Sequence, residues 1–255
     1  MPTLDTSEIW KVDSEITTSD RAQPHANDSM DFKRKIFLRG EVERENYILE
    51  RIVGFPRVLH LGCSDAPFTA ERLEEKGLLH SRLLERNTHV VGFDLSQHGL
   101  NLMKRAFPGA EFMHGNVEEM NRHFPEASFD LLIAGEILEH LSNPGAFFDS
   151  CRHVLSEDGV LLITVPNIFG IRRLIHSFFG VENYHPDHAF YFSENTLRVL
   201  AGRHGFSISK SFYYGSGSGN SLAKKLLYSC VETLPAFLFG NHFLEGLVIE
   251  LKKRL

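Results

Sequence analysis

Two short stretches of this 255-residue chain join a buried strand to residues that could hold a ligand. Val58–Leu61 runs into Gly62, and Val90–Phe93 runs into Asp94. Each stretch is typical of a short strand that ends in a tight turn. In an open α/β sheet, both turns lie at the carboxyl ends of neighbouring strands, where ligands bind. A glycine lets a ligand approach the backbone closely, and a carboxylate can accept hydrogen bonds from both hydroxyls of a ribose. The pair therefore indicates a cofactor that contains a nucleoside.

Gly62 could also be a plain turn residue, and Asp94 could simply cap the next helix. The segments that follow favour the cofactor interpretation over these two alternatives. Phe129–Glu136 is typical of a third buried strand, and Gly159–Asn167 of a fourth. Glu139 and His140 lie between them, on a short predicted helix. The alternation of strands and helices predicts a mostly parallel sheet with helices on both faces.

In this order, the segments resemble the class I S-adenosylmethionine-dependent methyltransferases. The resemblance covers roughly residues 45 to 212 and is most specific to the branch with an E-x-L-E-H-L segment, here Glu136–Leu141. It implies a Rossmann-like α/β fold, in which a seven-stranded, mostly parallel sheet carries helices on both faces and an antiparallel hairpin at one edge. In that fold the final strand, here Gly246–Leu251, inserts between two earlier strands. The implied cofactor is S-adenosyl-L-methionine.

The chain departs from the family at the glycine turn. The family usually has an acidic residue and three glycines there, whereas this chain reads His60–Ala66 with Ser64 and Ala66 in place of two glycines. Both residues are small, so close backbone approach is preserved without the freedom of glycine at positive φ. The interval before Asp94 is also longer than usual, which predicts extra helix around residues 73–84.

The resemblance implies a cofactor site made of the turns after several strands. Asp94 should hold the ribose, and Asn116 should bind the adenine amino group where the family more often has aspartate. The residues expected around the methionine end are Gly62, Cys63, Ser64, Ala134, Gly135 and Glu136, and those expected around the adenine are Leu95, Ser96 and Val117.

The candidate catalytic residues are three histidines. A sulfonium methyl group is already activated, so alignment supplies much of the rate, and a base is needed only for a protonated acceptor. The resemblance implies His140 as this base, although a helix histidine bonded into the structure is an equal alternative. His185 and His188 are further candidates. Together with Glu139 and Asp187 these histidines could also ligate a metal, but their spacing repeats no known pattern, so we expect no metal.

Two insertions depart from a minimal methyltransferase. Residues 168–191 hold three histidines, two tyrosines and four phenylalanines, and Tyr184–Tyr191 resembles an H-x-x-x-[FY]-[FY]-S stretch of the branch. We expect this insertion to close over the acceptor as a lid, the alternative being a structural excursion. Residues 222–243 predict apolar helices next to basic residues, which we expect to contact a second subunit or a lipid-bearing acceptor at a membrane surface. The alternative is packing on the sheet of the same chain.

Composition agrees with a cytoplasmic enzyme. A net charge of −6 and a pI near 6.2 argue against nucleic-acid partners, which need a basic face. Three cysteines without paired spacing fit a reducing compartment, and no secretory signal or membrane span is visible. Residues 1–30 are polar and are expected to be mobile, with Trp10 as an anchor, while residues 31–255 form one methyltransferase domain.

Three classes of function follow from these observations. The favoured class is a methyltransferase that transfers a methyl group to oxygen of a small-molecule or glycan-like acceptor. A methyltransferase that acts on a macromolecule would need a basic docking surface. A binding protein that kept the fold and lost catalysis would fit the altered glycine turn, while Asp94 and the Glu139–His140 pair argue against it.

Overall fold

The computed structural model describes residues 40–87, 89–182, 185–215, 231–232, 234–238 and 240–254. These residues belong to one compact unit, Ile36–Leu255. The expectations for residues 1–30 and for most of residues 222–233 lie outside the described part of the chain.

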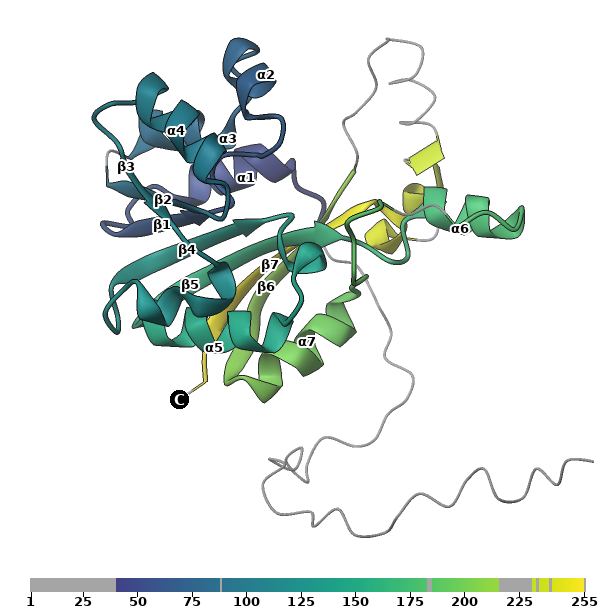
Figure 1. Ribbon diagram of the computed structural model, residues 1–255. Helices are drawn as coiled ribbons and strands as arrows, with labels where there is room; N and C mark the ends of the chain where they lie inside the picture. The colour runs from purple at the N-terminus through teal and green to yellow at the C-terminus, as the bar shows by residue number, and fades with distance from the viewer. Residues whose placement is uncertain are drawn as a thin grey trace, which may run out of the picture. The chain divides into compact units, whose positions relative to one another are not determined.

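One sheet organises the described residues (Figure 1). Seven strands follow the order β3-β2-β1-β4-β5-β7-β6. The strands β1 to β5 pair in parallel, whereas β7 is antiparallel to both of its neighbours, β5 and β6. The predicted Rossmann-like fold, with its final strand inserted between two earlier ones, is therefore confirmed. The bounds are β1 Val58–Leu61, β2 Val90–Asp94, β3 Glu111–His114, β4 Phe129–Gly135, β5 Leu155–Pro166, β6 Phe206–Tyr214 and β7 Gly246–Lys253.

The helices α1, α4, α5 and α7 begin at side-chain caps. The Asn143 side chain accepts the N–H of Ala146 at the start of α5, and Ser193 forms a capping box with Thr196 at the start of α7. The long interval before β2 holds two helices, α2 and α3, in the region where extra helix was predicted. The bounds are α1 Arg44–Arg51, α2 Thr69–Glu74, α3 Leu79–Arg86, α4 Gln97–Ala106, η2 Val117–Arg122, η3 Leu138–His140, α5 Pro144–Val154, α6 Ile171–Phe178, α7 Glu194–Arg203 and η4 Asn241–Phe243.

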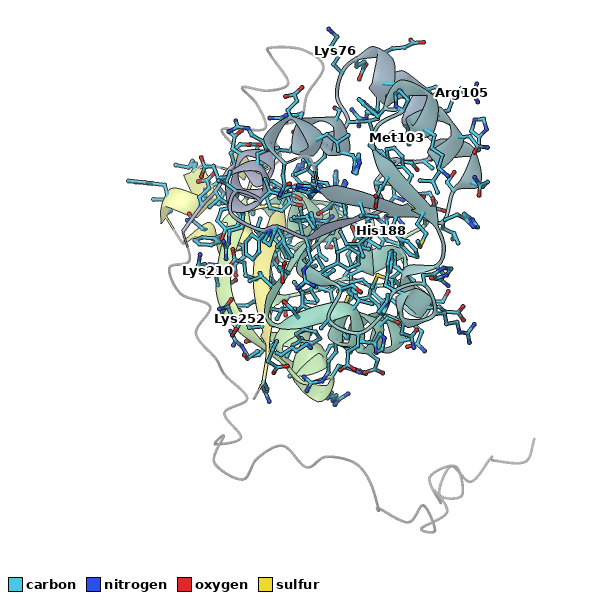
Figure 2. The ribbon with its side chains drawn as sticks, turned by 90° about the vertical axis from the view of Figure 1, so that its left-hand side faces the viewer. Lys76, Met103, Arg105, His188, Lys210 and Lys252 are labelled. Carbon is cyan, nitrogen blue, oxygen red and sulfur yellow. The ribbon has the colours of Figure 1, made fainter. Side chains whose placement is uncertain are left out.

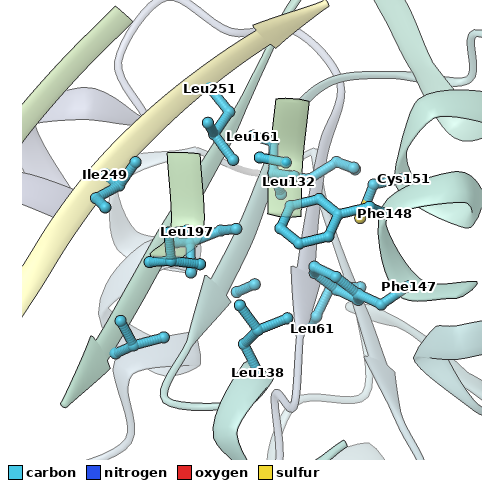
Figure 3. Close-up of a cluster of buried hydrophobic side chains, with 14 of the residues drawn as sticks. Leu61, Leu132, Leu138, Phe147, Phe148, Cys151, Leu161, Leu197, Ile249 and Leu251 are labelled. Atoms are coloured by element: carbon cyan, nitrogen blue, oxygen red, sulfur yellow. The ribbon is translucent and has the colours of Figure 1, made fainter. Parts of the chain in front are cut away.

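The two faces of the sheet hold separate cores because successive strand residues point to opposite sides. In β4, Leu131 and Ile133 pack with α1 and α3, whereas Leu132 and Ala134 pack with α5 and α7. Figure 3 shows the second of these cores, where the rings of α5 meet leucines from several strands. Phe148 is fully buried there. Full burial of such a side chain contributes about 1.5–3 kcal/mol, so these layers fix the strand ends that carry the site.

The start of β5 differs from the prediction. The sequence pattern placed the strand from Gly159, but β5 begins at Leu155, which pairs with Phe129 of β4. The register then shifts before the regular pairing of Leu131 with Val160. Leu155 is completely buried, and its side chain lies against Gly159. Burial of this one apolar residue extends the strand across a stretch whose local composition favours a turn.

Candidate cofactor and acceptor site

Asp94 joins the two turns that the sequence singled out. One carboxylate oxygen, Oδ2, accepts hydrogen bonds from the backbone N–H and the hydroxyl of Ser64, both at 2.8 Å. The other, Oδ1, accepts the N–H of Ser96 at 2.8 Å. A carboxylate has about four acceptor positions, so one remains on Oδ1 for a ribose hydroxyl. A second becomes free only when the Ser64 hydroxyl turns away. Ser64 therefore supports Asp94 in this structure rather than presenting its N–H to a ligand.

The turn after β1 is tight although it lacks two of the family glycines. Gly62 has φ of +67°, and a Cβ on it would lie 2.9 Å from Cδ1 of Ile137. Asp65 takes the left-handed conformation as well, with φ of 52°. Cys63 is buried against Gly92, and burial together with the charge of Asp94 raises the pKa of its thiol. The thiol is thus neutral, and Cys63 offers a ligand only its backbone.

The expected adenine side lies at the carboxyl ends of β2 and β3. Leu95 is 67% exposed, which is unusual for an apolar residue directly after a buried strand. An exposed leucine next to polar turns suits the flat face of an adenine ring. The Asn116 oxygen accepts the N–H of Glu118 at 3.0 Å, which leaves one acceptor position for an amino group. Val117 is buried beside it.

The end of β4 holds a polar cluster that sequence reasoning only partly found. Glu136 has a positive φ of 54°, and its carboxylate accepts the hydroxyl of Tyr214 at 2.7 Å. Arg44 donates to the hydroxyl of Thr164 at 3.0 Å, and a Cβ on Gly135 would lie 2.9 Å from the same guanidinium. Strained non-glycine residues of this kind cluster at functional sites. Arg44, Thr164 and Tyr214 come from α1, β5 and β6, so no local pattern could have grouped them with Glu136.

Glu139 is the most unusual group of the site. It is 1% exposed, and neither carboxylate oxygen has a hydrogen-bond partner among the described residues. Burial, reinforced by the charge of Glu136, raises the pKa of Glu139 to about 9. The group is therefore protonated at neutral pH. Its backbone oxygen accepts the N–H groups of Ala189 and Phe190 at 2.8 and 3.2 Å, which fixes the end of the 168–191 insertion beside η3.

The three candidate catalytic histidines lie together. Ring nitrogens of His140, His185 and His188 all fall within 4.8 Å of one another. His188, labelled in Figure 2, is half-buried, while the other two are exposed. Burial and the neighbouring His140 and His185 lower the pKa of His188 to about 4, so its ring is neutral at pH 7. The structure thus brings residues of η3 and of the 168–191 insertion into one cluster.

Both predicted insertions expose apolar side chains. Phe178 and Phe179, at the end of α6, are 90% and 80% exposed. In the second insertion, Phe237 is 84% exposed. One ion pair joins the two insertions, since Arg172 of α6 lies 3.4 Å from Glu232. Arg172 also lies 3.3 Å from Glu245, just after the second insertion. None of the described helices is long and apolar enough to cross a membrane.

Comparison with solved structures identifies the architecture. A SAM-dependent methyltransferase from Archaeoglobus fulgidus superposes with a TM-score of 0.53 at 19% identity, over 82% of this chain and 91% of that one. The fold is that of the class I methyltransferases. The YcgJ protein of Bacillus subtilis matches with a TM-score of 0.54 at 14% identity, over 83% and 98% of the two chains. The [4+2]-cyclase SpnF is also similar in fold, with a TM-score of 0.53 at 14% identity over 83% of this chain and 81% of that one.

Sequence comparisons agree over part of the chain. Residues 76–163 match the family model described as "Methyltransferase domain". A "Probable S-adenosylmethionine-dependent methyltransferase" of Mycolicibacterium smegmatis is 31% identical over 78 residues, 31% of this chain and 30% of that protein. A "Ubiquinone biosynthesis O-methyltransferase" of Xylella fastidiosa is 27% identical over 129 residues, 49% and 48% of the two chains. The chain thus spans about a third to a half of the length of these curated relatives.

Proposed function

We propose that this protein is an S-adenosylmethionine-dependent methyltransferase. The observation that carries the proposal is Asp94, a carboxylate at the end of β2 that is tied to the glycine turn after β1 and keeps an open acceptor position. This arrangement lies in a methyltransferase fold, and residues 76–163 match a methyltransferase domain. In the bound state Asp94 holds the ribose, Leu95 and Asn116 face the adenine, and the turns after β1 and β4 hold the methionine end.

The reaction we propose is methyl transfer to an oxygen. The acceptor hydroxyl loses its proton to a base, its oxygen attacks the methyl carbon, and the electron pair of the broken bond stays on sulfur, which gives S-adenosylhomocysteine. His140 is the candidate base because it lies on η3, the first helix after β4, and is exposed. The O-methyltransferase named for Xylella fastidiosa is similar over about half of the chain, which supports oxygen as the acceptor atom. The E-x-L-E-H-L branch remains what the segment Glu136–Leu141 suggests.

The acceptor we propose is a small or glycan-like molecule, in a cytoplasmic enzyme. The net charge of −6 disfavours nucleic acid as the substrate. Exposed Phe178, Phe179 and Phe237 on the two insertions favour an acceptor with an apolar or lipid-linked part, or a second subunit that covers them. Liposome flotation with anionic vesicles and light scattering distinguish these two occupants.

The 168–191 insertion is proposed as the lid over this acceptor. The two ends of the insertion are joined by a hydrogen bond, in which the N–H of Ile168 donates to the carbonyl oxygen of Phe192 at 2.9 Å. The insertion places His185 and His188 beside His140. Replacing either lid histidine with alanine should lower turnover and leave cofactor affinity nearly unchanged. Equal loss of cofactor binding and folding would favour a purely structural insertion.

A second candidate is a protein that binds the cofactor or a similar ligand without methyl transfer. Two observations favour it: the glycine turn lacks two family glycines, and a related fold serves the [4+2]-cyclase SpnF. Incubation with cofactor labelled in the methyl group, with extracts as a source of acceptors and Asp94→Ala as the control, tests the choice. Label that enters a product with wild type but not with the variant supports transfer. Cofactor binding without transfer to any acceptor favours the second candidate.

A further inference from the structure

The histidine cluster has the geometry of an empty metal site. A tetrahedral ion bound to imidazoles at 2.0–2.1 Å places its ligand nitrogens about 3.4 Å apart. Nitrogens of His140, His185 and His188 already lie within 4.8 Å of one another. His140 and His185 are exposed, so their side chains can rotate to close the difference. Sequence reasoning expected no metal because the spacing of these residues repeats no known ligand pattern, and only the fold of the lid brings them together.

The backbone of Asp187 orients two of the three rings. Its carbonyl oxygen lies 3.2 Å from Nδ1 of His140, which places the proton of that ring on Nδ1 and leaves Nε2 as a ligand atom. Metal-binding histidines commonly donate their second N–H to a backbone carbonyl in this way. The N–H of Asp187 lies 3.3 Å from Nδ1 of His185, a long contact. Coordination through Nε2 of His185 would move its proton to Nδ1 and give up only this contact.

His188 supplies an independent observation. Its Nδ1 atom is buried and has no hydrogen-bond partner among the described residues. A buried ring nitrogen without a partner carries a desolvation cost of about 1–3 kcal/mol, which a metal or its ligand can remove. The rings of His188 and His140 are 4.6 Å apart, and those of His188 and His185 are 4.8 Å apart. The unpartnered ring therefore stands next to both other candidate ligands.

The charges around the cluster permit a cation. Arg173 lies over the ring of Tyr191 at 5.5 Å, close to His188, but its charge is compensated by Glu245 at 3.1 Å. Asp187 adds an exposed carboxylate between the two lid histidines.

We propose that His140, His185 and His188 bind one divalent transition-metal ion of the zinc class. Imidazole ligands suit Zn²⁺, Cu²⁺, Ni²⁺ and Fe²⁺ rather than Mg²⁺ or Ca²⁺. Three protein ligands leave a tetrahedral ion one open position, the arrangement of catalytic rather than structural zinc. An oxygen of the acceptor fits that position, where the ion would favour loss of the hydroxyl proton in place of His140, whose two ring nitrogens are then both engaged. This last step rests on the proposed function. The metal also ties the lid to η3, since one ligand lies on η3 and two lie on the insertion.

Equilibrium dialysis of the tag-free full chain, stripped with a chelator, against Zn²⁺ tests the site. Wild type should take up one ion per chain with high affinity, and Co²⁺ in its place should give the visible absorption of a tetrahedral complex. His185→Ala and His188→Ala should weaken Zn²⁺ binding by more than the roughly tenfold that even outer-shell partners contribute. His89→Ala is the matched control, because His89 is exposed and precedes β2, at the amino ends of the parallel strands and away from the histidine cluster at their carboxyl ends.

His185 is exposed, so its replacement should leave thermal unfolding of the metal-free protein unchanged. Wild-type Zn²⁺ affinity in His185→Ala and His188→Ala, or no tight uptake by wild type, would overturn the metal site. Cofactor binding measured separately in chelator keeps the two proposals distinct. A protein that binds Zn²⁺ but not S-adenosylmethionine refutes the methyltransferase proposal alone, and the reverse result refutes the metal site alone.

Discussion

Replacing Asp94 with alanine should weaken S-adenosylmethionine binding more than any other single change in the site. The carboxylate has one open acceptor position on Oδ1 for a ribose hydroxyl. A hydrogen bond to a charged group contributes about 1.5–3 kcal/mol. Because 1.36 kcal/mol corresponds to a factor of ten, the dissociation constant should rise about 10- to 150-fold.

The same change removes three internal hydrogen bonds, from Ser64 and Ser96, so the variant should also be less stable. Cofactor affinity must therefore be measured by isothermal titration well below the unfolding temperature, after circular dichroism has shown native structure. Asp130→Ala is a matched control for stability, because Asp130 pairs with Arg57 and Ser156 near the start of β4. It should lower stability and leave affinity unchanged.

Ser64→Ala sharpens this prediction. It removes the hydroxyl that occupies Oδ2 of Asp94 and so frees a second acceptor position for the ribose. Its cofactor affinity should equal or exceed that of wild type. A folded Asp94→Ala protein that binds the cofactor like wild type would refute the assignment of the ribose to this carboxylate.

Three further predictions concern stability. His80 is fully buried, and burial lowers its pKa from 6.5 to about 4, so the contribution of this ring to stability is complete above pH 6.5 and falls by about 3 kcal/mol as the pH drops to 4. His60 lies with its Nδ1 3.1 Å from Nδ1 of His80, and burial together with His80 lowers its pKa as well, so in urea denaturation His80→Leu should remove part of the pH dependence and leave the part that comes from His60. An unchanged pH profile would contradict the account. Phe148→Ala should lower the free energy of unfolding by about 3–5 kcal/mol. Phe179 is 80% exposed, so Phe179→Ala should change the free energy of unfolding by less than about 0.5 kcal/mol. Equal losses of stability in the two variants would argue against the core in Figure 3. Gly62→Ala should cost about 1–2 kcal/mol through its positive φ and displace Ile137, so a thermal midpoint equal to wild type would disprove the strained turn.

The sequence predicted the features that depend on local pattern. Apolar runs that end in Gly62 and Asp94 identified two neighbouring strands, because buried strands have short-range signals. Tertiary burial was invisible to this reasoning. The single residue Leu155 extends β5, although the residues after it favour a turn.

The side-chain clusters could not be predicted for the same reason. Arg44 of α1 and Tyr214 of β6 meet the end of β4 from distant parts of the chain. His140 and His188 were each candidates on their own, but their meeting depends on the path of the lid, which is anchored by backbone bonds to Glu139. The additional role of Ser64 could not be predicted either, since nothing in the sequence indicates that this small turn residue donates two hydrogen bonds to the Asp94 carboxylate.

The central claim is that this chain binds S-adenosylmethionine at the ends of β1 and β2. Equilibrium dialysis of the full chain with cofactor labelled in the methyl group tests it most directly. The account predicts one saturable site per chain that S-adenosylhomocysteine competes for and that Asp94→Ala weakens. A natively folded protein that retains no labelled cofactor, even at millimolar concentration, would contradict the account.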